Sequence, residues 1–221
     1  MASKYIEALR LDSGRKANDK NMESGLRSFL MEFHRGLNDA LPKDSKTGLA
    51  NKHIIPKVIT KALQHLLGLE NSPSRERFFE VECRLKKYLK NSALKDKLLC
   101  ELIGNKRIDM VIHGPKTDLL IEFKSLGDFN SFGAAMAEMQ IVKKFTDKKR
   151  RLITSVMFLY PQQKSWNAEG FKRFKALDKE LHGEPSCDQI WCLATGENER
   201  TTFDVVQIAA FREFVLKNIL N

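Results

Sequence analysis

The sequence has 221 residues, enough for one sizeable domain and too few for two full-sized catalytic units. Its 42% hydrophobic content predicts a buried core and excludes a chain that is disordered throughout. The net charge of +10 favours an anionic partner, and it is unevenly spread, with +4, +6 and 0 over residues 1–70, 71–150 and 151–221.

The sequence has neither a long apolar run nor a clustered cysteine pattern. No stretch reaches the roughly 18 uncharged apolar residues of a membrane span, and the first residues lack the apolar run of a signal peptide. Four cysteines stand at irregular spacings, which favours free thiols. We therefore expect a cytoplasmic protein without membrane contact.

Apolar periodicity and turn residues predict the elements in chain order. Helices are expected over 18–41, 54–69 and 72–90, followed by an antiparallel meander of strands over 97–103, 107–112 and 118–124. A helix over 131–145, a strand over 152–160, a helix over 168–181, strands over 190–194 and 203–206 and a helix over 209–220 complete the pattern. The predicted class is mixed α/β, a mixed central sheet flanked by helices. Residues 1–70 are expected to form a helical subdomain for dimerisation or DNA contacts, and residues 71–221 the core.

One predicted hairpin brings two acids together. If Gly114 to Thr117 form the turn, Asp109 lies directly opposite Glu122, while apolar residues oppose each other at the neighbouring positions. Like charges placed opposite each other on a buried surface are destabilising unless something compensates them. A divalent cation does so well, because Mg²⁺ is usually held by one or two carboxylates together with water and phosphate oxygens.

Lys124 points to the same face as Glu122 and extends this pattern. A lysine there can orient or deprotonate an attacking water and stabilise the charge that develops during phosphodiester hydrolysis. The alternative is a salt-bridged surface hairpin in which Lys124 lies across from Arg107. That alternative explains less well why Val111 and Leu120 flank the acids on the same face.

Asp109, twelve intervening residues and Glu122-Phe123-Lys124, within the order helix, three strands, helix, strand, resemble the core of the PD-(D/E)XK nuclease superfamily. The resemblance covers residues 74–160 and implies a restriction-endonuclease-like α-β-β-β-α-β core. It also implies that Asp109, Glu122 and the Phe123 carbonyl bind Mg²⁺, with Mn²⁺ as a substitute, and that Lys124 serves the attacking water. Ile108 stands where the motif has proline, a position that supplies no ligand.

Further site residues are expected on the two helices that flank the hairpin. On a helical wheel for residues 72–90, Glu82 lies within the apolar stripe, and the resemblance implies that such a glutamate assists metal binding; a flank residue paired with a lysine is the alternative. On the helix after the motif, Lys143, Gln140 and Lys144 are expected to contact nucleic acid. For Lys143 the alternative is a lysine that extends past core residues.

The expected function is that of an Mg²⁺-dependent endodeoxyribonuclease, most simply a type II restriction-like homodimer, since two strands must be cut. A repair, recombination or mobile-element nuclease of the same fold would look alike. A non-catalytic nucleic-acid-binding module that retains the fold is the alternative from another class. A protein-interaction scaffold would leave the net charge of +10 unexplained.

Overall fold

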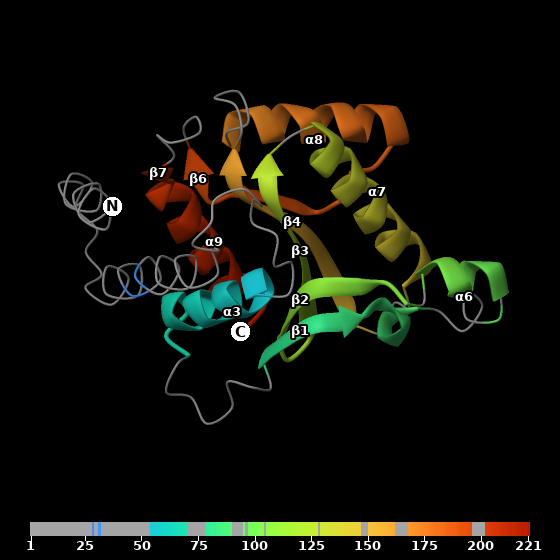
Figure 1. Cartoon of the computed structure of the whole chain (residues 1–221), viewed down its shortest axis with the longest axis horizontal. Coiled ribbons are helices and arrows are strands. Elements are labelled where there is room, and N and C mark those ends of the chain that lie inside the picture. Colours follow the sequence, from blue (N-terminus) through green and yellow to red (C-terminus); the bar gives the residue numbers. More distant parts are fainter. Residues whose placement is uncertain are drawn as a thin grey trace, which may run out of the picture.

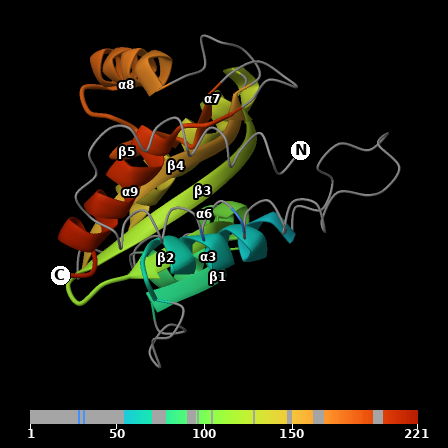
Figure 2. The same cartoon turned by 90° about the vertical axis from the view of Figure 1, so that its left-hand side faces the viewer.

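The computed structural model describes residues 28, 31, 54–69, 78–89, 95, 97–103, 105–127, 129–146, 150–161, 168–195 and 202–221. Their centre is a five-stranded sheet in the order β1-β2-β3-β4-β5 (Figures 1 and 2). The strands are β1 Phe79–Arg84, β2 Arg107–His113, β3 Thr117–Gly127, β4 Arg151–Pro161 and β5 Gln189–Cys192. The first three are antiparallel neighbours, whereas β4 runs parallel to β3 and β5 parallel to β4. The chain is therefore α/β with a mixed sheet, as its sequence predicts.

Helices cover both faces of this sheet (Figure 1). The helices α3 Ile54–Leu66 and α9 Val205–Asn218 pack on one face, and α7 Phe129–Phe145 and α8 Ala168–His182 pack on the other. Because parallel neighbours need a crossover, α7 joins β3 to β4 and α8 joins β4 to β5. Two short segments, η1 Leu85–Tyr88 and α6 Lys97–Ile103, follow β1, and β6 Ala194–Thr195 pairs with β7 Thr202–Phe203.

Two apolar clusters hold the layers together. On the α3 and α9 face, Met110 and Ile112 of β2 are fully buried with helical residues such as Leu63 and Phe211. On the α7 and α8 face, the rings of Phe158 and Phe171 stack with their centroids 4.3 Å apart. Because each cluster buries aromatic and branched side chains, the central strands are enclosed from both sides.

The central hairpin has the predicted register. The observed pairs run from Met110 opposite Ile121 to His113 opposite Asp118, and the Gly114 N–H donates to the Thr117 carbonyl at 2.9 Å to close the turn. The helices over 131–145 and 168–181 and the strand over 152–160 are also confirmed to within a few residues. At the C-terminal end, α9 starts at Val205, earlier than predicted, because Asp204 caps it by accepting from the Gln207 N–H at 3.0 Å.

The predicted helix over 72–90 is wrong where the structure describes it. Residues Phe79–Arg84 form the edge strand β1, followed by the single 3₁₀ turn η1. Its sequence, FEVECR, alternates apolar and charged residues, which is the period of a half-buried strand. The helical wheel combined this strand with Leu85 and Leu89, which lie beyond its end.

The predicted strand over 97–103 is also wrong, because these residues form α6. A seven-residue apolar run cannot be assigned by periodicity alone. In the helix, Leu98 is 67% exposed whereas Ile103 is buried, so one side of the run packs and the other does not.

The predicted helix over 18–41 lies outside the described residues except for residues 28 and 31, which are both helical. Within 1–70 the structure also describes α3, whose buried residues join the sheet in one apolar cluster. The assignment of residues 1–70 to dimerisation or DNA contacts stays a prediction. Among the described residues, no helix has the length and apolar character that a membrane crossing requires.

Candidate functional site

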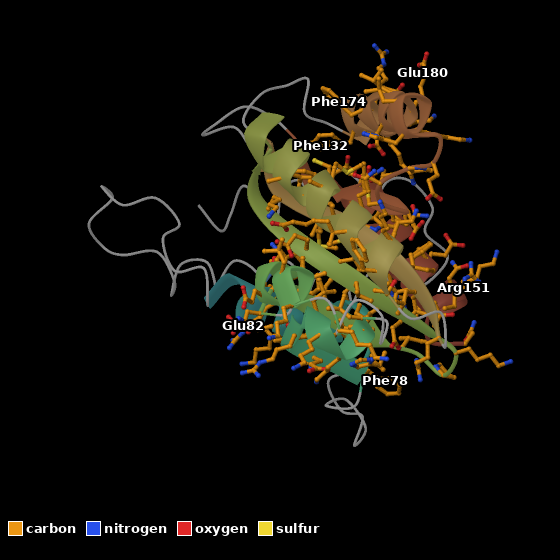
Figure 3. The ribbon with its side chains drawn as sticks, turned by 90° about the vertical axis from the view of Figure 1, so that its right-hand side faces the viewer. Phe78, Glu82, Phe132, Arg151, Phe174 and Glu180 are labelled. Carbon is orange, nitrogen blue, oxygen red and sulfur yellow. The ribbon has the colours of Figure 1, made fainter. Side chains whose placement is uncertain are left out.

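Asp109 of β2 and Glu122 and Lys124 of β3 lie on the sheet face that α7 covers. Their same-face neighbours Val111 and Leu120 are fully buried in the apolar cluster that includes α7. The observed hairpin register extends to place Asp109 opposite Glu122, as the sequence predicts. The structure therefore brings the two predicted carboxylates and the predicted lysine together beneath one helix, which crosses in front of the sheet in Figure 3.

The carboxylate of Asp109 accepts a backbone hydrogen bond just beyond the last paired residues of β2 and β3. The last paired residues are Met110 and Ile121, and beyond them the Phe123 N–H donates to Asp109 Oδ2 at 2.7 Å. Burial raises the pKa of Asp109, although this hydrogen bond and the charge of Lys124 oppose the shift. Asp109 is thus held rigidly beside the backbone of the residue whose carbonyl the sequence nominates as a ligand.

Glu122 is the most deeply buried acid of the site, with 5% of its surface exposed. Its Oε1 accepts from Lys124 Nζ at 3.0 Å, but its Oε2 has no donor among the described residues. Burial and the negative charge of Asp109 raise the pKa of Glu122 to about 8, against the opposing charge of Lys124. A side-chain hydrogen bond between Glu122 and Glu138 also raises the pKa of Glu122 and lowers that of Glu138, so a proton held by Glu122 offsets the cost of its buried oxygen.

Glu138 of α7 is a third acid at this site, and the sequence analysis missed it. Its Oε2 lies 3.7 Å from Lys124 Nζ, too far for a hydrogen bond, and is likewise buried without a donor among the described residues. Its other oxygen forms an ion pair with Lys106, the residue before β2. The sequence contained one signal for it. Glu138 stands three residues after Ala135 and four before Val142, which are both buried, so its spacing places it on the packed side of α7.

The site has an excess of negative charge when all its groups are ionised. Burial alone would lower the pKa of Lys124, but the charge of Glu122 outweighs it and raises that pKa. Burial would raise the pKa of Glu138, but its hydrogen bond to Lys106 prevails and lowers it. Three carboxylates thus face two lysines, and Glu122 is the acid that tends to keep a proton.

The donor set fits a small hard cation. Mg²⁺ takes carboxylate and carbonyl oxygens and is usually held by one or two carboxylates, with the remaining positions left to water or phosphate. Glu122 Oε2 and Glu138 Oε2 are two buried oxygens without a donor in the described part of the chain. Over those same residues, no three His, Cys, Asp or Glu side chains form a ready-made metal cluster. The carboxylate oxygens are thus of the kind that Mg²⁺ prefers, and cation binding here stays a prediction.

Glu82 lies on β1, where the strand register places it opposite Asp109. The β1–β2 ladder skips this position, and Glu82 has a positive φ of 51°, a conformation that residues other than glycine rarely adopt. Its carboxylate accepts from Arg107 Nη1 at 2.6 Å. The structure thus pairs Glu82 with Arg107 at the strand end, and its expected assistance to metal binding stays a prediction.

The three residues nominated for nucleic-acid contact on α7 differ in their surroundings. Lys143 donates to the Pro185 carbonyl at 2.8 Å and to Asp188 Oδ1 at 3.0 Å, which ties α7 to the loop before β5. Lys144 is exposed, with its Nζ 5.9 Å from the Phe145 ring centroid, and Gln140 is exposed on the same helix. Lys143 therefore has a structural partner, and the nucleic-acid role of all three residues stays a prediction.

A cavity of about 450 Å³ lies at the opposite end of the hairpin from the carboxylate site and is lined in part by His113, Asp118 and Arg150. Its charged groups neutralise one another, since Asp118 Oδ1 accepts from Arg150 at 2.8 Å and lies 3.3 Å from His113 Nδ1. It therefore differs from the carboxylate site, where acids outnumber their partners.

Comparison with known proteins adds no relative to this geometry: no family model matches the chain, and no curated protein or solved structure is significantly similar to it.

Proposed function

We propose that the protein is an Mg²⁺-dependent endonuclease that hydrolyses DNA phosphodiester bonds at the site formed by Asp109, Glu122 and Lys124. The observation that carries the proposal is the buried pair of acids on one hairpin, with a lysine donating to one of them at 3.0 Å. Structural ion pairs are normally balanced, whereas this group leaves a buried Glu122 oxygen without a donor in the described residues.

The order of elements supports the PD-(D/E)XK assignment. The elements α3, β1, β2, β3, α7 and β4 occur in this order along the chain, with η1 and the extra helix α6 inserted between β1 and β2. Apart from that insertion, this matches the α-β-β-β-α-β order that the resemblance implies, with α3 in place of the incorrectly predicted helix over 72–90. The acids stand on the second and third strands, as the motif requires.

In this proposal the carboxylates of Asp109 and Glu122 and the Phe123 carbonyl hold Mg²⁺, and Glu138 is a further carboxylate within reach. When bound, the cation supplies Lewis-acid stabilisation of the phosphate charge. Lys124 is positioned to orient the attacking water and to stabilise negative charge. Water adds to phosphorus, the bond from phosphorus to the leaving oxygen breaks, and that oxygen takes up a proton, which leaves one phosphate monoester and one hydroxyl end.

The test is cleavage of supercoiled plasmid by the purified full chain. With Mg²⁺ we expect nicked or linear product, and EDTA should abolish it. Asp109→Asn and Glu122→Gln remove proposed metal ligands and Lys124→Met removes the proposed acid–base group, so each should lower the rate by about 10² or more. Discrete fragments would indicate a sequence-specific, restriction-type enzyme.

A matched control is Glu169→Gln, which changes an acid of α8 whose side chain is 62% exposed and should leave the rate unchanged. Wild-type activity in Asp109→Asn would contradict the assignment of catalysis to this site. Salt-sensitive DNA binding without cleavage in Mg²⁺ or Mn²⁺ would contradict the proposal and favour the non-catalytic module.

A further inference from the structure

A cluster of basic side chains lies where β1 ends and β2 begins. Arg84 and Arg107 are direct cross-strand partners there, and Lys86 stands two residues after Arg84, in η1. Helix α6 packs beside η1 at the same end of the sheet (Figure 1). We call this set the β1–α6 basic surface, and its members are Arg84, Lys86, Lys87, Lys95, Lys97 and Arg107.

The β1–α6 basic surface carries more positive charge than its own acids neutralise. Residues 80–107 include eight basic and four acidic side chains. Glu80 pairs with Lys87 and Glu82 pairs with Arg107, but Arg84, Lys86, Lys95 and Lys97 form no ion pair with any described residue. All four are exposed. Like charges directly opposite each other, as at Arg84 and Arg107, are destabilising. An anionic partner would reduce the repulsion between the positive charges of this surface.

Contacts connect the surface to the carboxylate site. The Leu85 N–H donates to the Lys106 carbonyl at 2.8 Å, which fixes η1 to the residue that precedes β2. Lys106 itself pairs with Glu138, whose Oε2 is 3.7 Å from Lys124 Nζ. Figure 3 shows nitrogen-tipped side chains around Glu82, on the side of the molecule that α6 and α7 face. A linear polyanion lying on the surface would therefore pass beside the carboxylates.

The side chains favour phosphates as the anions. A guanidinium group matches a phosphate with two parallel hydrogen bonds, and arginines at the ends of paired strands are less mobile than those of a flexible tail. The surface extends over β1, η1, β2 and α6, so it offers several cations in succession instead of a single anion pocket. The exposed Leu98 beside Lys97 adds an apolar contact at its margin.

We propose that the β1–α6 basic surface is the track along which the phosphate backbone of duplex DNA binds next to the carboxylate site, an inference that rests on the proposed function for its substrate. It assigns the DNA contacts to the strand ends and α6, in place of Lys143, which is bound to Asp188.

The test separates binding from cleavage by working in EDTA. The anisotropy of a short fluorescein-labelled duplex measures affinity for the full chain and for the double variant Arg84→Gln/Lys86→Gln between about 50 and 200 mM salt. Each lost phosphate contact should lower the salt slope by about 0.9, so we expect a slope smaller by about 2 and an affinity about 10- to 50-fold weaker near 0.1 M salt. The matched control is Lys172→Gln/Lys179→Gln, two exposed lysines of α8 on a different part of the molecule, which should bind like the wild type.

The inference would be overturned if both double variants lowered the affinity for the duplex equally, or if neither lowered it. If the wild type cleaves plasmid and Arg84→Gln/Lys86→Gln binds and cleaves as well, the proposed function stands and the track is wrong. If DNA binding depends on these two residues but no variant or wild type cleaves, the track is supported and the proposed function is wrong. Loss of binding to anionic phospholipid vesicles in the variant, with DNA binding unchanged, would assign the surface to a membrane and overturn the inference.

Discussion

Asp118 and Glu122 are buried acids on the same face of β3, yet their surroundings act on them in opposite directions. Burial would raise the pKa of Asp118, but its hydrogen bond to His113 and its ion pair with Arg150 lower it below the usual value. At Glu122, burial and the charge of Asp109 together raise the pKa to about 8. Asp118 therefore stabilises the fold as a carboxylate, whereas Glu122 destabilises it unless a cation binds.

The contact between His113 and Asp118 predicts how stability depends on pH. The hydrogen bond from His113 to Asp118 raises the pKa of His113, and this effect outweighs burial, which lowers the pKa. Glu80 also raises it, since Glu80 Oε2 lies 3.4 Å from the same ring. A raised histidine pKa contributes stability that is complete below the unfolded value of about 6.5 and is lost as pH rises through the folded value. The wild type should therefore exceed His113→Gln in unfolding free energy most at about pH 5.5 and least at about pH 9.

Urea unfolding followed by circular dichroism at several pH values measures this difference. A wild-type advantage that grows with pH would show that His113 does not act as the cation of this cluster.

The hairpin of β2 and β3 shows how far sequence alone reaches at the level of elements. A tight turn and a run of apolar pairs fix the register, and the register predicts that Asp109, Glu122 and Lys124 share a face. Glu138 and Lys106 join them only because α7 packs across that face and α6 precedes β2. Such contacts depend on helix packing, which local periodicity does not encode.

The misassigned elements have a related cause. The wheel for residues 72–90 joined a strand to the turn that follows it, because Phe78, Leu85 and Leu89 happen to recur at helical spacing. The alternation of FEVECR was the correct signal, but six residues are few against a longer helical pattern. At residues 97–103 the period of the apolar run suits either a strand or a helix, and the structure has the helix α6.

The turn at Gly114 is a point where two elements constrain one residue. A Cβ at this position would lie 1.7 Å from the backbone carbonyl oxygen of Ile219, which follows α9. Backbone cannot move away as a flexible side chain does, so Gly114→Ala should lower the unfolding free energy by about 1–3 kcal/mol. Gly133→Ala on α7 meets no atom within 4 Å and should raise it by about 0.5–1 kcal/mol, since alanine favours helix.

Chemical denaturation of the two alanine variants beside the wild type checks this pair, since both substitutions add one methyl group. A stable Gly114→Ala would show that the end of α9 does not lie against the hairpin turn. It would also contradict the close approach of the Ile219 backbone to Gly114, which we take to hold the C-terminal helix against the sheet.

At the scale of the whole molecule, the two apolar clusters provide the stability that permits an unbalanced site. They enclose the sheet from both faces, and the carboxylates lie at the margin of the cluster that includes α7. Ionisation of the buried Glu122 carboxyl lowers the free energy of unfolding, and carboxyl groups perturbed in this way are commoner at binding and catalytic sites than in the rest of a fold. Under the proposed function, the same carboxylates link the stability of the chain to cation binding.

This link predicts a magnesium-dependent melting temperature. A ligand that binds only the folded chain stabilises it by about 3 kcal/mol at a hundredfold excess over its Kd, which for a chain of this size is a shift of roughly 5 to 10 °C. Glu122→Gln should melt higher than the wild type without Mg²⁺, because an amide replaces a buried carboxylate whose Oε2 has no donor among the described residues, and Mg²⁺ should then shift it little. Differential scanning fluorimetry at pH 8, with NaCl at matched ionic strength as the control, measures both effects. An equal Mg²⁺ shift in the wild type and in Glu122→Gln would place the cation elsewhere, because a ligand whose carboxylate is lost cannot bind the metal as before.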